Sequence, residues 1–144
     1  MQTLLIQMMS NLQNKSDILT DAAKFLHDKG WYPAVAHGAY YGCYQLSKHI
    51  WLHKMRKTQQ ELDLLCSSGK IGSHEVLINE VRNFIRDSKK ADCSNHMSDY
   101  YRLIGQLKRL RVKADYDDEI FDSSASRSAI SLSDTIISIL KKYQ

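Results

Sequence analysis

Four basic residues gather near the end of a predicted helix. They are Lys108, Arg109, Arg111 and Lys113. Arginine can hold a phosphate group through two parallel hydrogen bonds, and lysine adds a point charge, so this patch suits a phosphorylated or nucleic-acid ligand. The same side chains also stabilise a helix without any ligand, because cations favour the negative end of its dipole by about 0.3–1 kcal/mol each. The sequence leaves both interpretations open.

Three further residues extend this candidate site. Asp115 either accepts hydrogen bonds from backbone N–H groups in a turn, with Tyr116 packed inward, or pairs with an arginine and orients it for phosphate. His74 either bonds a neighbouring side chain at the start of a helix or faces the arginines in a pocket, where imidazole can transfer protons near neutral pH. The predicted ligand-binding residues are Arg109, Arg111, Lys113, Asp115, Tyr116 and His74.

No metal site or cofactor is predicted. The three cysteines, Cys43, Cys66 and Cys93, are widely separated and lack a CxxC spacing, so we expect reduced structural thiols. His49 and His53 lie four residues apart, as metal-binding pairs on helices do, but no third ligand accompanies them and both are expected to be exposed.

The composition is that of one soluble domain over residues 1–144. Apolar residues at 43%, charged residues at 25%, one proline and six glycines favour helices over turn-rich strands. The net charge of +4 permits an anionic partner but is too small for a dedicated nucleic-acid coat. The apolar run from Met1 to Met9 is too short to span a bilayer and lacks a basic leader, so we expect a cytoplasmic protein with no membrane partner.

Apolar residues at helical spacing predict an all-α, up-and-down bundle of about five helices. The expected helices cover about residues 3–28, 33–55, 73–88, 96–113 and 124–143, and the first segment is either one helix or two that are broken near Asn14. Ser73, and Ser123 or Ser124, are expected to cap the helices that follow them. Residues 56–72 lose the periodicity and contain Gly69 and Gly72, so a mobile connection with at most a short helical turn is predicted.

The helix over residues 33–55 is expected to be central because it carries two stripes. The first, apolar stripe consists of Val35, Ala39, Cys43, Leu46 and Ile50. The second, aromatic and polar stripe consists of His37, Tyr40, Tyr41, Tyr44 and Lys48. We expect the tyrosines to pack in the core with their hydroxyl groups at its edge.

Three segments, in order, then carry a family resemblance. The first is AHGAYYGCYQLSK at residues 36–48, which follows the turn Gly30-Trp31-Tyr32. The second is SHEVLI at residues 73–78, and the third is RVKADYD at residues 111–117. Together they resemble the HEPN domains, specifically short stand-alone prokaryotic members with an Arg-x-x-Ala-Asp-Tyr signature, over roughly residues 17–143. The resemblance implies a helical bundle that pairs as a homodimer, with the fourth helices of two subunits facing a shared cleft.

Many proteins of that family are ribonucleases that carry an arginine followed after four to six residues by a histidine. In this chain the position of that histidine, counted back from Tyr116, holds Ala114, with Arg109 at the matching upstream distance. No arginine in the sequence is followed by a histidine at the required interval. The usual metal-independent RNA cleavage is therefore not expected. The missing motif argues against an enzyme.

Three functions follow from this resemblance. The leading hypothesis is a non-catalytic or degenerate HEPN module that binds an anionic ligand, either a nucleotide or RNA, or a protein partner such as an antitoxin in a toxin–antitoxin or defence operon. The first alternative is a divergent metal-independent ribonuclease toxin that uses His74 or Tyr116 instead of the missing histidine. The second is a structural partner of a separately encoded nucleotidyltransferase.

Overall fold

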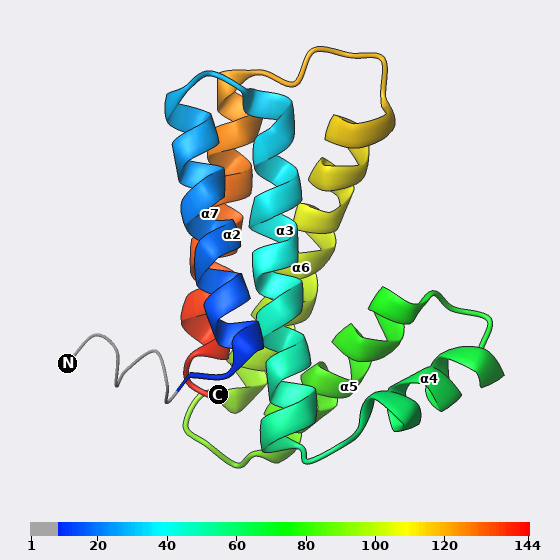
Figure 1. The fold of residues 1–144 in the computed structure, drawn as a ribbon. Helices are drawn as coiled ribbons and strands as arrows, with labels where there is room; N and C mark the ends of the chain where they lie inside the picture. Colours follow the sequence, from blue (N-terminus) through cyan, green and yellow to red (C-terminus); the bar gives the residue numbers. More distant parts are fainter. Residues whose placement is uncertain (1–8) are drawn as a thin grey trace.

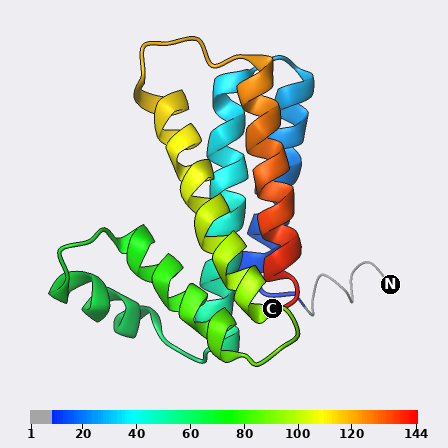
Figure 2. The same cartoon turned by 180° about the vertical axis from the view of Figure 1, so that it is seen from behind.

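The structure is a computed structural model that describes residues 9–144, and every regular element in that range is helical. The elements are α2 (Asn11–Asp28), α3 (Tyr32–His49), the π-helical turn η1 (Ile50–Lys54), α4 (Gln59–Ser68), α5 (Ser73–Asp87), α6 (Cys93–Tyr116) and α7 (Ser123–Leu140). The long helices α2, α3, α6 and α7 run up and down beside one another, while α4 and α5 form an arm at one end (Figures 1 and 2). The predicted all-α bundle is confirmed, and the part of its first helix at residues 3–8 lies outside the described residues.

Helix α3 lies at the centre, as predicted. It packs against α2, α6 and α7, and its apolar stripe is fully buried. Gly30, with a φ of +77°, ends the preceding turn in the left-handed region, and Pro33 occupies the first turn of α3, where its missing N–H costs nothing. Among residues 9–144, no helix has the combination of length and apolarity needed to cross a bilayer.

Two glycines let α2 and α3 approach each other closely. A Cβ atom at Gly38 would lie 2.9 Å from the backbone oxygen of Leu19, and one at Gly42 would lie 2.8 Å from Oγ1 of Thr20. The Oγ of Ser16 donates a hydrogen bond of 2.7 Å to the carbonyl of Gly42 across the same contact. This tight pairing fixes one side of α3 and directs its second stripe towards α5 and α6.

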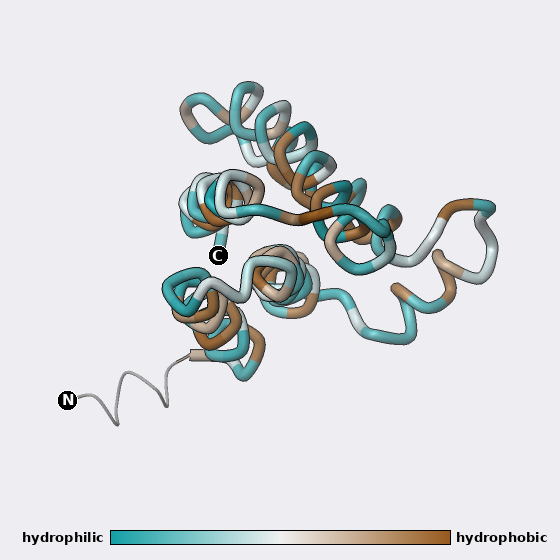
Figure 3. Tube along the Cα trace, turned by 90° about the horizontal axis from the view of Figure 1, so that it is seen from above, coloured by the Kyte–Doolittle hydropathy of each residue, from teal (hydrophilic) through white to brown (hydrophobic). Residues whose placement is uncertain are grey.

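The prediction of a mobile connection over residues 56–72 is wrong for its middle part, which forms the ten-residue helix α4. Thr58 accepts a hydrogen bond from the backbone N–H of Glu61, and the Glu61 side chain accepts one from the backbone N–H of Thr58. This reciprocal capping box starts the helix, and Leu62 anchors it in the core. The view along the bundle shows α4 outside the group of long helices (Figure 3).

Two predicted caps are displaced by one or two residues. Gly72, not Ser73, holds the capping position of α5, and no side chain caps that helix. Asp122, not Ser123 or Ser124, caps α7, because its carboxylate accepts a hydrogen bond of 2.9 Å from the N–H of Ala125. The start of α5 therefore keeps backbone N–H groups that no side chain caps.

Candidate functional site

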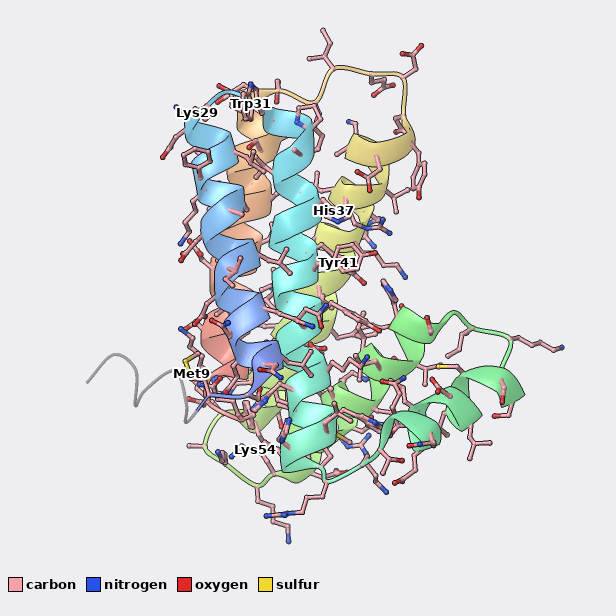
Figure 4. All side chains as sticks on the ribbon, viewed as in Figure 1. Met9, Lys29, Trp31, His37, Tyr41 and Lys54 are labelled. Carbon is pink, nitrogen blue, oxygen red and sulfur yellow. The ribbon has the colours of Figure 1, made fainter. Side chains whose placement is uncertain are left out.

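Arg111 lies where α6 meets the aromatic stripe of α3. Its side chain is only 13% exposed. The guanidinium carbon lies 5.3 Å from the ring centroid of Tyr40 and 5.6 Å from that of Tyr41. Cation–π attraction strengthens when the cation is desolvated, so these two rings stabilise the charge in its half-enclosed position. Tyr41 lies on the side of α3 that faces α6 (Figure 4).

Asp115 pairs with Arg111 rather than closing a turn. One carboxylate oxygen of Asp115 lies 3.2 Å from a terminal guanidinium nitrogen of Arg111, one helical turn away. The same oxygen lies 3.9 Å from Nδ1 of His37. The prediction of a turn at Asp115 with Tyr116 packed inward is wrong, because α6 continues through both residues and Tyr116 is 75% exposed. The alternative, a carboxylate that orients the guanidinium, is the one observed.

The Nε atom of Arg111 is buried and has no hydrogen-bond partner in the protein. A buried donor without a partner costs about 1–3 kcal/mol. The ion pair with Asp115 uses a terminal nitrogen, so it leaves this donor unsatisfied. Arg111 thus keeps hydrogen-bonding capacity beyond its contact with Asp115.

His74 joins the same cluster from the first turn of α5. Its Nδ1 lies 2.9 Å from the hydroxyl of Tyr40, and its ring centroid lies 4.3 Å from that of Tyr44. Burial raises the pKa of Tyr40, so this phenol keeps its proton. The structure thus shows the predicted bond of His74 to a neighbouring side chain, whereas its role as a pocket group that faces the arginines stays a prediction.

The charge state of His74 follows from its surroundings. Burial lowers its pKa, and the positive charges of Lys108 and Arg111 lower it further. Both influences disfavour a second positive group in one place, so the imidazole is neutral at pH 7. A neutral ring offers one hydrogen-bond donor and one acceptor, and it gains a charge only when an anion or lower pH favours protonation.

The start of α5 adds backbone donors beside His74. The first intrahelical bond of α5 runs from the N–H of Val76 to the carbonyl of Gly72. The N–H groups of residues 73–75 precede it and have no carbonyl within the helix to bind. The positive end of the helix dipole therefore lies beside His74, close to the cationic face of α6. Together with the two α6 cations, these donors make the region suited to a negatively charged group.

A groove of about 370 Å³ lies between α5 and α6, and its lining includes Glu75, which follows His74, and Lys108, whose charge acts on His74. The buried side chains of Ile78 and Ile104 contribute to its wall, and Lys108 and Arg109 supply positive charge. Tyr101 also lines the groove, and the guanidinium of Arg82 lies 4.4 Å from its ring centroid. With Arg102 and Glu75, which also line it, the groove combines apolar and aromatic surface with three cations and one carboxylate.

The structure separates some residues that the sequence had grouped. Arg111 faces α3, whereas Arg109 lines the α5–α6 groove, as expected for positions about 200° apart around a helix. Lys113 is turned to solvent and pairs with Glu119 at 3.6 Å. Only Arg111, Asp115 and His74 of the six predicted residues form one cluster. A cleft shared by two subunits stays a prediction.

Lys108 and the tyrosines of α3 complete the site. The sequence indicated Lys108 only as an extension of the basic patch, and it assigned Tyr40, Tyr41 and Tyr44 to the core. Tyr40 is buried as expected, but Tyr41 and Tyr44 are half-buried, and all three contact a residue of the cluster. The sequence feature that could have identified these tyrosines as site residues is the second stripe of α3, which combines aromatic residues with His37.

Within the described part of the chain, no group of three or more His, Cys, Asp or Glu side chains could hold a metal ion. Comparison with known proteins gives no match, since no family model, no curated protein and no solved structure matches this chain.

Proposed function

We propose that this chain is a HEPN-like module that binds the phosphate groups of an anionic ligand, RNA or a nucleotide, where α5 meets α6. One observation carries the proposal: the uncapped start of α5, with His74, lies beside Lys108 and Arg111 of α6. Backbone N–H groups at a helix start and charge-assisted side-chain donors are the common ligands of phosphate in proteins. The sequence resemblance supports the same ligand class.

The neighbouring groove supports a ligand larger than a single phosphate. One face of Tyr101 is backed by Arg82, and the ring remains 40% exposed. Aromatic side chains of this kind stack on nucleobases with little sequence preference, contributing about 1–3 kcal/mol per base. Gly105 lies one turn further along α6 and leaves space beside Tyr101 in the groove.

Binding of a fluorescently labelled single-stranded RNA, followed by fluorescence anisotropy, tests the proposal. Lys108→Ala should weaken binding by at least about tenfold, because a charge-assisted phosphate contact contributes about 1.5–3 kcal/mol. Its loss should also reduce the salt dependence, by about 0.7 in the slope of log K against log salt concentration. Arg111→Gln should weaken binding similarly.

Lys15→Ala is the matched control, since Lys15 is an exposed lysine on α2, which packs on α3 and α7 rather than on the arm. This variant should bind RNA as the wild type does. Equal losses for Lys15→Ala and Lys108→Ala would show only general charge attraction and would contradict the proposed site. Wild-type affinity in Lys108→Ala would contradict it as well.

A second candidate, metal-independent RNA cleavage, is favoured by one specific observation. His74 is neutral at pH 7, so it can accept a proton from a ribose 2′-hydroxyl. It also lies near a guanidinium, which can stabilise the negative charge that develops on the phosphate. If Nδ1 carries the proton donated to Tyr40, then Nε2 is the basic atom. The attack would form a 2′,3′-cyclic phosphate and release a 5′-hydroxyl, with a proton returned to the leaving oxygen.

Incubation of defined RNA in EDTA separates the two candidates. A ribonuclease would yield 2′,3′-cyclic phosphate ends, would not cleave RNA carrying a 2′-deoxy substitution at the cut site, and would lose activity in His74→Gln. RNA that stays intact while it binds supports the non-catalytic module.

A further inference from the structure

A second histidine cluster lies at the C-terminal end of α3, beyond the tyrosines that contact the phosphate site. Here α3 passes into η1, and α2 begins nearby. The last residue of the chain, Gln144, lies at the same place. A cavity of about 490 Å³ at this end is lined by Met9, Ser10, His49, His53 and Lys54, among others. Met9 and Lys54 lie at the same end of the bundle (Figure 4).

His49 is the unusual member of this cluster. Its side chain was expected to be exposed, but the residue is 4% exposed. Nδ1 lies 2.7 Å from Oγ of Ser10, while Nε2 is buried and has no hydrogen-bond partner. Buried polar atoms in folded proteins are nearly always bonded, so an orphan imidazole nitrogen beside a cavity calls for an explanation.

Ser10 holds the imidazole ring in position. Its Oγ also accepts a hydrogen bond of 3.1 Å from the N–H of Gln13, as part of the cap of α2. A histidine that binds a metal through one nitrogen commonly has its other nitrogen fixed by such a hydrogen bond. When Nδ1–H donates to Ser10, the lone pair of His49 is on Nε2, the atom without a partner.

The π-helical turn brings a second imidazole beside the first. The ring centroids of His49 and His53 lie 5.0 Å apart, with an interplanar angle of 27°. Two metal–imidazole bonds of about 2.0 Å each place the two bound nitrogens no more than about 4 Å apart, so the ring of His53 must turn to aim a nitrogen at an ion bound by His49. His53 is exposed, so its ring has room to turn. Single π-helical turns of this kind occur frequently at functional sites.

The remaining donors select the class of ion. Met9 brings a thioether to the same cavity, whereas the residues that line it include no Asp or Glu side chain and one cation, Lys54. Neutral nitrogen and sulfur donors suit a soft ion, and a neighbouring positive charge repels a divalent ion more than a monovalent one. We propose that this cavity binds a soft monovalent metal ion, copper(I), through His49, His53 and Met9.

Competition with the chromogenic copper(I) chelator bicinchoninate, without oxygen and with a reductant, tests this site. The full chain should carry Cys66→Ser and Cys93→Ser, because accessible thiols also bind copper(I), whereas Cys43 is fully buried. This background protein should withdraw one equivalent of copper(I) from the chelator. His53→Ala should weaken binding at least tenfold, and since His53 is exposed, the variant should fold normally.

Two further variants and a control complete the test. His49→Asn keeps a donor for Ser10, its side-chain amide N–H, and should weaken copper(I) binding at least tenfold, as should Met9→Ile. His96→Ala is the control, because His96 bonds the hydroxyl of Tyr143 and does not line the cavity. Failure of the background protein to withdraw copper, an equal loss in His96→Ala, or tighter binding of zinc(II) than of copper(I) would each overturn the proposal.

Discussion

His74, on α5 against the middle of α3, and His49, the last residue of α3, have both been buried by packing. Each is bonded through Nδ1 to a hydroxyl group, that of Tyr40 at 2.9 Å and that of Ser10 at 2.7 Å. Burial is the largest cause of a lowered pKa in both. Packing therefore makes both imidazoles neutral at pH 7, and the pKa alone does not distinguish the two regions.

The neighbours of the two histidines do distinguish them. His74 lies beside the uncapped start of α5 and two cationic side chains of α6, which attract an anion. His49 lies beside a second imidazole and a cavity lined by a thioether, which suit a soft cation. The comparison teaches that burial sets the protonation state of a histidine, whereas the charges and donors around it set the class of ligand.

The largest expected effect concerns acid and His49. Burial lowers the pKa of His49 from 6.5 to about 4. Between these values the unfolded chain binds a proton that the folded protein does not, so the free energy of unfolding falls as pH falls from 6.5 to 4. The shift corresponds to about 3 kcal/mol. Urea denaturation at pH 7, 5.5 and 4, with a metal chelator present, should show this loss in the wild type and a smaller one in His49→Asn. Identical pH dependences would contradict the buried, neutral state.

Removal of Ser10 should have the next largest effect. Ser10→Ala deletes the cap of α2 and the partner of His49, and it should lower the free energy of unfolding by about 1–2 kcal/mol. RNA affinity should stay unchanged, because the phosphate site lies elsewhere on α3. Ser67→Ala, which removes an exposed hydrogen bond within α4, should be nearly neutral. A loss of RNA affinity in Ser10→Ala would break the separation of the two regions.

The matching change at the other histidine is Tyr40→Phe. It removes the hydrogen bond to Nδ1 of His74 while keeping the buried ring, so it should cost about 1 kcal/mol in the free energy of unfolding. Tyr116→Phe is the control, since Tyr116 is 75% exposed. Thermal or urea denaturation measures both. An equal cost for the two substitutions would show that the contact with His74 does not stabilise the fold.

The smallest expected effect is the pH dependence of RNA binding. Protonation of His74 below its lowered pKa adds a positive charge at the phosphate site, so affinity should rise as pH falls from 7.5 to 5.5. One partly exposed charge contributes about 0.5–1 kcal/mol, which corresponds to about two- to fivefold in affinity. Anisotropy titrations should show this gain in the wild type beyond that in His74→Gln. Equal gains in both proteins would assign the pH effect to other groups.

Much of the bundle was predictable because its signals are local. The stripe from Val35 to Ile50 predicted α3, and Gly30 and Pro33 predicted where this helix begins. Neither prediction needed tertiary information. The helix α4 was missed although Thr58 and Glu61 form a capping box visible in the sequence, because weak apolar periodicity outweighed it. A capping motif is in this case the better indicator of a short helix.

The site was only partly predictable because its members come from three helices. Helical spacing placed Arg109 and Arg111 on one predicted helix, but their separation around α6 directs them to different neighbours. No sequence rule shows that Tyr40 and Tyr41 would contact Arg111 or that His74 would bond Tyr40, since these contacts depend on the crossing of α3, α5 and α6. Likewise, the burial of His49 depends on the start of α2 folding against the end of α3.

A histidine-selective NMR titration tests the central claim most directly, because it follows all six imidazoles of the chain at once. Resonances should be recorded across pH with and without a short single-stranded RNA, in metal-free buffer. Phosphate bound beside His74 should raise the pKa of that ring, while the resonances of His49 should stay unchanged. An unchanged pKa of His74 in the presence of bound RNA, or equal changes at His74 and His49, would contradict the proposed phosphate site.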